Sequence, residues 1–534
     1  MAFSTSKIPY RETGAFSKLA LDYIDQLPSL KPFFSNPASL KGIEDAIAIR
    51  QQFSTDRDLL QQALKDQYVG KQITEAVSSN LEKLASKNCF TITTAHQNNL
   101  FTGPLYFIYK ILHAISLSEK LNKLHPEFHF VPVYYMGTED ADFEELNHVF
   151  FADKKYQWET NQKGAVGRMK IDQPLMNLIT EMVSQLVSLP NGANTVSLLK
   201  KYYKEGLTIS DATFSLVNEL FGEYGLIVLN PDHSLLKKQM ISIFKEELLG
   251  QFSCDIVKET GSQLEKAGYG AQAFPRAINL FYLFEQGRER IEKVDNKWVV
   301  NGTNYSFTES ELIKELETSP ERFSPNVILR PLYQSTILPD VAFIGGGGEI
   351  AYWLQLQSVF NKCAVPFPAV FLRNSFLIAE PQQINKLNKL GFSISEIFAS
   401  TDQLLLKFLK AKGEDLFTSA AEQNAITDLY DDLKKRAAAI DPTMVAHIDA
   451  LLHKASEKLN TLDKKLIRSQ KRKFKAEEFT LKIVKDQLFP YGKLQERHEN
   501  FFFYLAKLGE GLIPMLHESS LTTEQEFVIV SLKN

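Results

Sequence analysis

The chain has 534 residues, of which 44% are hydrophobic and 23% are charged, which is the composition of an ordinary soluble protein with two or three domains. Its 60 Lys and Arg residues against 64 Asp and Glu residues give a formal net charge of −4. This balance gives no electrostatic reason to expect nucleic acid as a partner. We therefore expect ligands of small-molecule size.

No apolar run approaches the roughly 18 residues of a spanning helix, and the N-terminus lacks the uninterrupted apolar stretch of a signal peptide. These features predict a cytoplasmic protein with no membrane partner. The three cysteines, Cys89, Cys254 and Cys363, show no CxxC spacing. This pattern argues against a disulfide framework and against a thiolate zinc site.

The first two thirds of the chain predict an α/β fold. Residues 1–88 show mostly helical spacing, which indicates a helical lead-in packed on a core. From 89 to about 380, strands alternate with helices, as in a parallel, doubly wound sheet. The predicted strands are 90–95, 128–136, 225–230, 327–330, 341–345 and 369–372, and the predicted helices are 105–124, 234–249 and 349–361. Two insertions interrupt the alternation, one mostly helical at about 151–224 and one at about 251–324 with a hairpin at 290–302.

Residues 381–500 are predicted to be helical, with a long arm over 442–488. Its apolar residues recur at spacings of 4 and 3, as in a coiled-coil seam: Ile448, Leu452, Ala455, Leu459, Leu462 and Leu466. A preceding helix offers Ile426, Leu429, Leu433 and Ile440, and the turn at Asp441-Pro442 predicts an antiparallel hairpin. Such an arm needs a partner, so we expect self-association. Residues 501–534 are predicted to return to the core, with a last strand at 524–532.

The stretch from Thr91 to Lys110 predicts a strand, a polar loop and the start of a helix. The loop carries His96, Gln97, Asn98 and Asn99. Thr102 is a predicted N-cap and Pro104 suits the first helical turn, where free backbone N–H groups attract phosphate or carboxylate. The alternative interpretation is an ordinary strand-to-helix turn without a ligand.

Three acids, Glu139, Asp140 and Asp142, follow the predicted strand 128–136. Ligands of open α/β sheets bind beyond the carboxyl ends of the strands, where these acids are expected. The acids could bind an amine, hold Mg²⁺ or serve as a general base. Alternatively, they form the acidic first turn of a helix and complement its dipole.

Four glycines, 345–348, follow another predicted strand and would let the backbone approach a ligand closely. They match neither a Walker A motif nor a GxGxxG loop, and a tight turn without a ligand is the alternative. Arg276, Arg330 and Arg373 are candidate partners of carboxylate or phosphate, or of structural acids. The junction from Lys493 to Arg497 is a further anion candidate.

Together these motifs resemble the cysteine ligase family of bacillithiol synthesis, BshC. The resemblance rests on His96-Gln97, Thr102-Gly103-Pro104, Tyr106, Tyr109-Lys110, Glu139-Asp140, Asp142, Asn147-His148, Ser324–Asn326, Arg330-Pro331, Gly345–Trp353 and Leu494–Arg497. It implies a Rossmann-like parallel-sheet core with helical insertions, an antiparallel coiled-coil domain and a homodimer. It also implies a ligase that joins L-cysteine to the amine of glucosaminyl-malate through an amide bond, forming bacillithiol.

The resemblance further implies ATP as the activator of the cysteine carboxylate, with or without Mg²⁺, and no zinc. The implied catalytic residues are His96 and Lys110, which would stabilise transferred charge, and Glu139, Asp140 or Asp142, which would orient or deprotonate the amine. The implied substrate or nucleotide ligands are Gln97, Asn98, Thr102, Gly103, Tyr106, Asn147, Arg330, Gly346, Gly347, Gly348, Glu349, Tyr352, Lys493, Gln495 and Arg497.

Two positions depart from the family pattern. Ser335 stands where an acid is common, which puts a carboxylate role there in doubt, and Gly347 stands where proline is frequent. Two alternatives to the ligase remain open. One is another nucleotide-dependent ligase or transferase on the same core, and the other is a non-catalytic coiled-coil scaffold.

Overall fold

The computed structural model describes residues 2–151, 154–412 and 419–533. The chain divides into two compact units, each described here by itself. Unit 1 comprises Met1–Leu377 and Lys493–Val530, and unit 2 comprises Ile378–Gly492 and Ser531–Asn534. Over the described ranges, no helix has the length and apolar character needed to cross a membrane.

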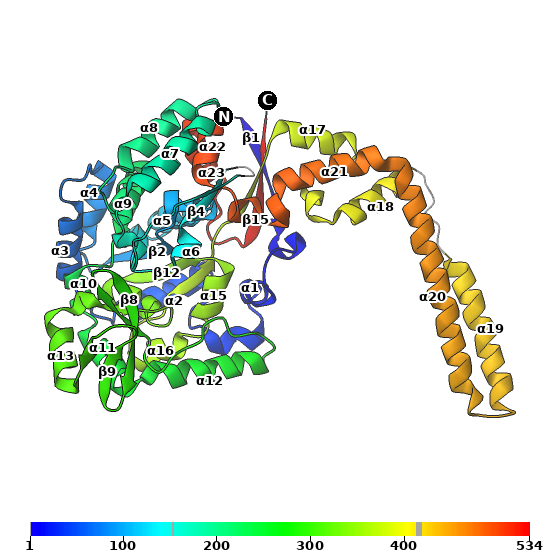
Figure 1. The fold of residues 1–534 in the computed structure, drawn as a ribbon, viewed down its shortest axis with the longest axis horizontal. Helices are drawn as coiled ribbons and strands as arrows, with labels where there is room; N and C mark the ends of the chain where they lie inside the picture. Colours follow the sequence, from blue (N-terminus) through cyan, green and yellow to red (C-terminus); the bar gives the residue numbers. More distant parts are fainter. Residues whose placement is uncertain (1, 152–153, 413–418, 534) are drawn as a thin grey trace. The chain divides into compact units, whose positions relative to one another are not determined.

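Unit 1 is built on a five-stranded sheet (Figure 1). Its strands are β2 (Cys89–Gln97), β3 (His129–Gly137), β6 (Ile227–Leu229), β12 (Asp340–Gly345) and β13 (Ala369–Leu372). The spatial order is β13-β12-β2-β3-β6, and every neighbouring pair is parallel. The chain moves outward from β2 to β6 and then returns to the other side of β2 with β12. The predicted doubly wound sheet is confirmed, and its topological switch point lies between β2 and β12.

The strand predicted at 327–330 is wrong. The Asn326 side-chain oxygen accepts the Ile328 N–H at 2.9 Å, which forms a local turn. Pro331 then occupies the first turn of α14 (Arg330–Ile337), where its missing N–H costs nothing. A short apolar run therefore becomes a turn and a helix start.

Helix α5 (Tyr106–Leu124) follows β2 almost as predicted. The other two predicted helices are each divided in two by the structure. Residues 234–249 form α10 (Ser234–Lys238) and α11 (Ile241–Gly250), and residues 349–361 form α15 (Gly347–Trp353) and α16 (Gln357–Lys362). Between the last two, the Gln355 side chain accepts the N–H groups of Gln272 and Ala273, both at 2.8 Å, which fixes the connection to a neighbouring loop.

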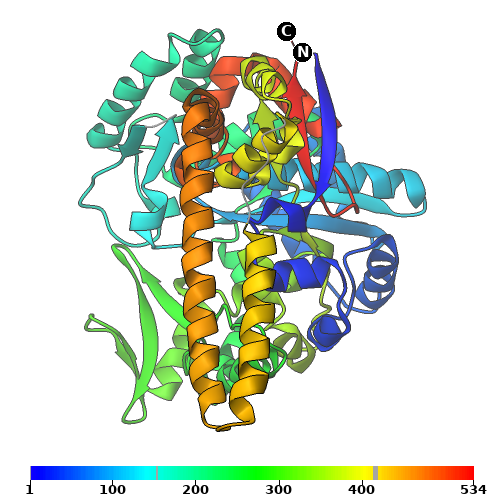
Figure 2. The same cartoon turned by 90° about the vertical axis from the view of Figure 1, so that its right-hand side faces the viewer.

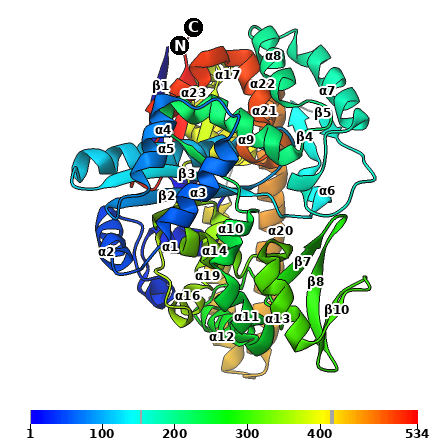
Figure 3. The same cartoon turned by 90° about the vertical axis from the view of Figure 1, so that its left-hand side faces the viewer.

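The two insertions form separate groups of elements (Figure 3). The first contains α6 (Phe143–Leu146), β4 (His148–Phe151), β5 (Lys154–Gln157), α7 (Gln173–Leu186), α8 (Gly192–Tyr202) and α9 (Ile209–Phe221). The second contains α12 (Phe252–Lys266), β7 (Leu280–Phe284), β8 (Gly287–Val294), β9 (Lys297–Val300), β10 (Ser306–Phe307), α13 (Glu309–Thr318) and β11 (Phe323–Pro325). Its strands form an antiparallel sheet in the order β10-β9-β8-β7-β11. The predicted hairpin is confirmed, because Asp295 and Asn296 connect β8 to β9 with φ angles of 47° and 61°, as a primed turn requires.

The lead-in contains α1 (Lys18–Ile24), α2 (Leu40–Arg50), α3 (Arg57–Tyr68) and α4 (Glu75–Lys83), and also a strand that its helical spacing did not predict, β1 (Phe3–Pro9). That strand belongs to a three-stranded sheet of order β1-β15-β14 with β15 (Glu526–Leu532) and β14 (Phe376–Ala379). The predicted last strand is therefore confirmed. Arg50 at the end of α2 ties the lead-in to the core through a buried ion pair of 2.8 Å with Asp340 of β12.

Unit 2 contains α17 (Pro381–Lys389), α18 (Thr401–Ala411), α19 (Ala420–Ala438), α20 (Met444–Lys471) and α21 (Lys475–Leu488). The predicted antiparallel hairpin is confirmed, because α19 and α20 lie side by side and run in opposite directions (Figures 1 and 2). The predicted seam of α19 is wrong beyond Ile426, since Leu429, Leu433 and Ile440 are 58%, 36% and 88% exposed. The side chains that α20 half-covers are instead Gln423, Ile426, Tyr430, Lys434 and Ala437. Since α20 covers the face of α19 that carries these five residues, the face that carries Leu429 and Leu433 stays exposed.

Candidate active site at the switch point

The helices that follow β2 and β12 are joined by an ion pair between Lys110 of α5 and Glu349 of α15. The Lys110 ammonium group also donates to the Ala95 carbonyl at 2.9 Å. Burial lowers the pKa of Lys110, and the Glu349 carboxylate opposes that shift. Two predicted site residues from distant parts of the chain therefore meet at the switch point.

The glycine turn is closed by the same acid. The Gly346 N–H donates to the Glu349 carboxylate at 2.8 Å, so one N–H group that we had expected to face an anion is already bound. A Cβ atom on Gly345 would lie 2.8 Å from the Phe343 ring, which explains this glycine sterically. Gly347 and Gly348 have ordinary φ angles, since neither is among the residues with positive φ. The turn therefore brings Glu349 to Lys110.

Two arginines stand near this pair. Arg330 donates to the Tyr352 hydroxyl at 2.9 Å and to the Gln334 side chain at 3.1 Å. Arg373, which follows β13, donates to the Glu496 carboxylate at 2.7 Å, and its guanidinium carbon lies 4.9 Å from the centre of the Tyr106 ring. Burial works against the charged form of Arg373, but the Glu496 carboxylate raises its pKa above the ordinary value.

Glu496 is the residue that sequence reasoning missed. It is fully buried and accepts hydrogen bonds from the Arg373 side chain, the Ser375 hydroxyl and the Phe376 N–H, the last at 3.3 Å. Its neighbours were predicted instead: Gln495 is buried, whereas Arg497 and Lys493 are exposed. Its place in the Leu494–Arg497 motif marks Glu496 as a candidate, but nothing in the local sequence identifies Arg373 as its partner.

The end of β2 and the polar loop after it contain buried polar atoms without partners. His96 Nε2, both side-chain polar atoms of Asn98, Asn99 Oδ1 and Thr102 Oγ1 have no hydrogen-bond partner among the described residues. Burial, together with the charges of Lys110 and Arg373, lowers the pKa of His96 well below its ordinary value of 6.5. Buried polar groups are nearly always bonded, so these atoms indicate a place that a polar ligand or ordered water fills.

The helix start after this loop differs from the prediction. Thr102 is not an N-cap: α5 begins at Tyr106 with Leu105 as its N-cap residue. The N–H groups of Leu105, Phe107 and Ile108 donate to the carbonyl groups of Glu499, Pro104 and Leu105, at 2.8, 3.1 and 3.0 Å. These bonds leave few free N–H groups at this helix end, so the anion site predicted there is not the main feature of the loop.

The three acids have different surroundings. Glu139 is buried and bound by the Lys237 ammonium group and by the Ser324 hydroxyl, the latter at 2.9 Å. Asp140 is half-buried and accepts a short hydrogen bond from Gln97 at the end of β2. Asp142 is exposed at the start of α6, and its side chain caps no N–H. Asp140 is thus the acid that the structure connects to the end of the central strand.

Asn147 and Ser335 complete the account of the predicted positions. Asn147 is buried, its side-chain oxygen lies 3.2 Å from His148 Nδ1, and its carbonyl accepts the Trp158 N–H. Ser335, at the position where an acid was expected, donates at 2.9 Å to Asp340, the partner of Arg50. Ser335 therefore belongs to the ion-pair network at the start of β12, and not to the carboxyl end of that strand.

Family comparison agrees with this architecture. The model of the N-terminal Rossmann-like domain of bacillithiol biosynthesis BshC matches residues 3–374, and the model of the C-terminal coiled-coil domain of BshC matches residues 376–532. The chain belongs to the BshC family. The expected combination of a Rossmann-like core and a coiled-coil domain is confirmed.

BshC relatives match over almost their whole length. A protein of Cytophaga hutchinsonii, named "Putative cysteine ligase BshC", is 39% identical over 518 residues, which cover 97% of each chain. A protein of Flavobacterium johnsoniae with the same name is 39% identical over 531 residues, which cover 99% of this chain and 100% of the relative. A third relative with this name, from Salinibacter ruber, is 29% identical over 98% of each chain.

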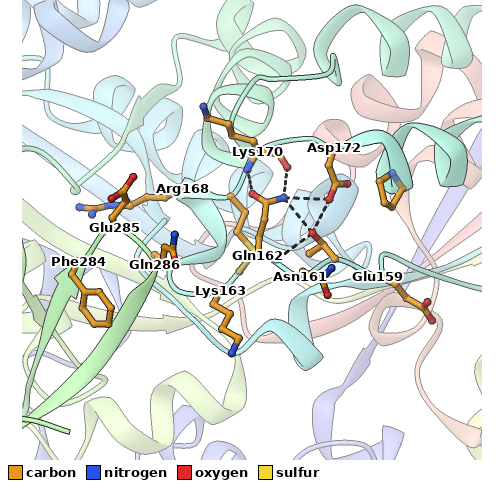
Figure 4. Close-up of a pocket in the computed structure, with 14 residues that line it drawn as sticks. Glu159, Asn161, Gln162, Lys163, Arg168, Lys170, Asp172, Phe284, Glu285 and Gln286 are labelled. Atoms are coloured by element: carbon orange, nitrogen blue, oxygen red, sulfur yellow. Dashed lines mark hydrogen bonds between the residues drawn. The ribbon is translucent and has the colours of Figure 1, made fainter. Parts of the chain in front are cut away.

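A cavity of about 950 Å³ is lined by none of the residues that carry the BshC resemblance, although Val166, next to its lining residue Ala165, donates its N–H to the Asp140 carbonyl at 2.8 Å. It is lined by Glu159, Thr160, Asn161, Gln162, Lys163, Ala165, Arg168, Met169, Lys170, Asp172, Pro174, Phe284, Glu285 and Gln286 (Figure 4). Several of its polar groups bond to one another. The Gln162 side chain donates to the Lys170 carbonyl and accepts the Lys170 N–H, and Asp172 accepts from the Thr160 hydroxyl at 2.7 Å. Among the described residues, those that line this cavity have no buried side-chain polar atom without a partner, so the switch point is the stronger candidate site.

Proposed function

We propose that this protein is a cysteine ligase that joins the carboxyl group of L-cysteine to the amine of glucosaminyl-malate, forming the amide of bacillithiol. The names of its BshC relatives support this proposal. The observation that carries it is the set of unpartnered buried polar atoms beside buried cations at the switch point. Such a place suits a polar, anionic substrate.

The charges of the site favour an anion. Lys110 is neutralised by Glu349, and Arg373 by Glu496. Arg330 is bonded to uncharged groups only, and the described part of the chain gives it no carboxylate partner. One positive charge is therefore left over, and the planar guanidinium group matches a carboxylate or a phosphoryl group.

The same residues fit a nucleotide's phosphate groups, because the orphaned donors of Asn98 and His96 and the charge of Arg330 converge on one sheet edge. ATP would supply an activated cysteine carboxylate, as an adenylate or an acyl phosphate. Arg330 then binds the anionic group, while Lys110 and Arg373 add positive charge that is preorganised by Glu349 and Glu496. His96 stays neutral near pH 7 and offers a hydrogen bond rather than a charge.

Asp140 is the proposed base for the amine. Gln97 binds one of its oxygens, and the carboxylate is half-buried at the end of β3, next to β2. It orients the ammonium group of the acceptor and accepts its proton, which frees the nitrogen lone pair to attack the activated carboxyl carbon; the amide C–N bond forms as the C–O bond to the phosphoryl group breaks and AMP or phosphate leaves. Glu139 is committed to Lys237 and Ser324, so we assign it no contact with the substrate.

The exposed stripe on α19 supports a homodimer. Leu429, Leu433 and Ile440 lie on a face that α20 does not cover. A second copy of the arm would bury this stripe, as apolar seams do in coiled coils.

A direct assay tests the function. Purified protein is incubated with glucosaminyl-malate, L-cysteine and ATP, and the thiol product is sought by mass spectrometry. Arg330→Met should abolish the product, whereas Lys163→Ala, in the separate cavity, should not. No product with normal ATP binding would favour another nucleotide-dependent ligase or transferase. No nucleotide binding at all would favour a non-catalytic scaffold.

A further inference from the structure

The loop between β2 and α5 is held in a strained conformation. Phe101, Thr102 and Gly103 have consecutive φ angles of 49°, 69° and 69°. The left-handed region costs a residue with a side chain about 1–2 kcal/mol. A Cβ atom on Gly103 would lie 2.8 Å from Asn99 Cβ, so the third position needs glycine. A loop with two unfavourable residues persists only when its surroundings hold it.

Asn500, about 400 positions later in the chain, stabilises this conformation of the loop. Its side-chain NH₂ group donates to the Phe101 carbonyl at 2.9 Å and to the Gly103 carbonyl at 2.6 Å. Its side-chain oxygen accepts the Phe502 N–H at 2.9 Å and caps α22 (Phe501–Leu508). An amide has two donors and an acceptor, so the one buried side chain serves the loop and the helix at the same time.

Backbone contacts fasten the loop on its other side. The Leu105 N–H donates to the Glu499 carbonyl at 2.8 Å, and Pro104 pairs with Asn500 in an isolated antiparallel bridge. The Asn500 N–H is itself anchored on the Phe150 carbonyl at 3.1 Å. Asn500 therefore binds the carbonyl groups of residues 101 and 103, and its neighbour Glu499 binds the backbone N–H of Leu105.

The loop so held carries the orphaned polar atoms. Asn98 is fully buried, and neither its amide nitrogen nor its oxygen has a partner among the described residues. Thr102 is 2% exposed, and its hydroxyl lacks a partner over the same residues. Their positions depend on the backbone between them, which is the part that Asn500 binds.

We propose that Asn500 is a positioning residue of the active site: its amide holds loop 98–103 in the strained conformation that presents Asn98 and Thr102 to the ligand. This inference rests on the proposed ligase function. Asn500 itself contacts no substrate, because its polar atoms are already bound to protein. Without it, the loop relaxes into conformations that are not competent to bind, and the apparent affinity falls by the competent fraction.

Asn500→Ser tests the proposal, because serine still caps a helix but cannot reach both carbonyl groups. We expect KM for the substrate bound by the loop to rise at least about tenfold, with kcat at saturation within about threefold of the wild-type value. Asn500→Asp, which also keeps the cap but places a carboxylate against two carbonyl oxygens, should have a larger effect. Thr308→Ala removes the cap of α13, a helix far from Asn500 in sequence, and is the control for lost helix capping.

Hydrogen exchange of the substrate-free protein separates this inference from the ligase function. The amides of residues 100–103 and 105 should exchange faster in Asn500→Ser than in the wild type and the Thr308→Ala control. An inactive wild-type enzyme would overturn the ligase function but leave this measurement in force. Unchanged exchange in Asn500→Ser would overturn the positioning role. If the wild type is active, a wild-type KM in Asn500→Ser would overturn it as well.

Discussion

The ammonium group of Lys110 lies against the carboxylate of Glu349 and joins the helix after β2 to the helix after β12. These strands are neighbours in the sheet but are separated by more than 200 residues in sequence. The pair therefore lies at the point where the chain reverses its direction across the sheet. Both side chains are largely buried, so each depends on the other for compensation of its charge.

Removal of one partner should destabilise unit 1 strongly. Lys110→Met leaves the Glu349 carboxylate with only the Gly346 N–H, and the free energy of unfolding should fall by roughly 3–5 kcal/mol. Urea unfolding measures this loss. The double variant Lys110→Met with Glu349→Leu should be more stable than either single variant, since no unpaired charge remains. Additive losses in the double variant would contradict a direct coupling of the two residues.

Glu139 and Asp140 should behave differently although they are adjacent. Glu139→Gln leaves the fully buried Lys237 without its acid, so the free energy of unfolding should fall by roughly 3–5 kcal/mol. Asp140→Asn should lower kcat at least about a hundredfold, by loss of the base, with a change in stability under about 1 kcal/mol. Chemical unfolding and ligase kinetics on both variants check this contrast. Wild-type turnover in Asp140→Asn would remove Asp140 from the mechanism.

Acid should destabilise the protein partly through His96. Burial keeps its folded-state pKa well below 6.5, so below that pH the unfolded chain takes up a proton that the folded protein does not. The stability that neutral His96 provides is present above its unfolded pKa and is lost as pH falls toward its folded pKa. Between pH 7 and 5 the wild type should lose up to about 2 kcal/mol more than His96→Gln.

The measurement is urea unfolding of both proteins at a series of pH values. His113, whose pKa burial lowers to about 4, acts in the same direction, but it is present in both proteins and cancels in the difference. If the free energy of unfolding falls equally with pH in the wild type and His96→Gln, His96 takes up its proton as readily in the folded protein as in the unfolded chain.

The arm should control the oligomeric state. Leu429→Asp with Leu433→Asp places charges on the exposed stripe of α19, where the two residues are 58% and 36% exposed. We expect light scattering to give the mass of a dimer for the wild type and of a monomer for the variant. Lys435→Glu, at an exposed position of the same helix, should leave the mass unchanged. A variant that keeps the wild-type mass would exclude this stripe as the contact.

The sequence by itself determined the α/β core, the arm hairpin and most elements, because they follow from local patterns. From Cys89 to Ala95, strand β2 consists of apolar or β-branched residues, and α5 and α20 carry helical periodicity. The motif set was also sufficient to indicate the BshC family. Residues 327–330 misled the prediction, because the turn depends on one side-chain bond of Asn326.

Only the tertiary structure decided which polar residues meet. Periodicity says nothing about partners far apart in the chain, so neither the pairing of Glu139 with Lys237 nor that of Arg373 with Glu496 could be predicted. The strained loop at residues 101–103 was equally hidden, because its conformation is maintained by Asn500 and not by its own sequence. Burial and long-range hydrogen bonds commit Glu139 and Glu496 to partners within the protein, whereas Asp140 stays half-buried at the end of β3.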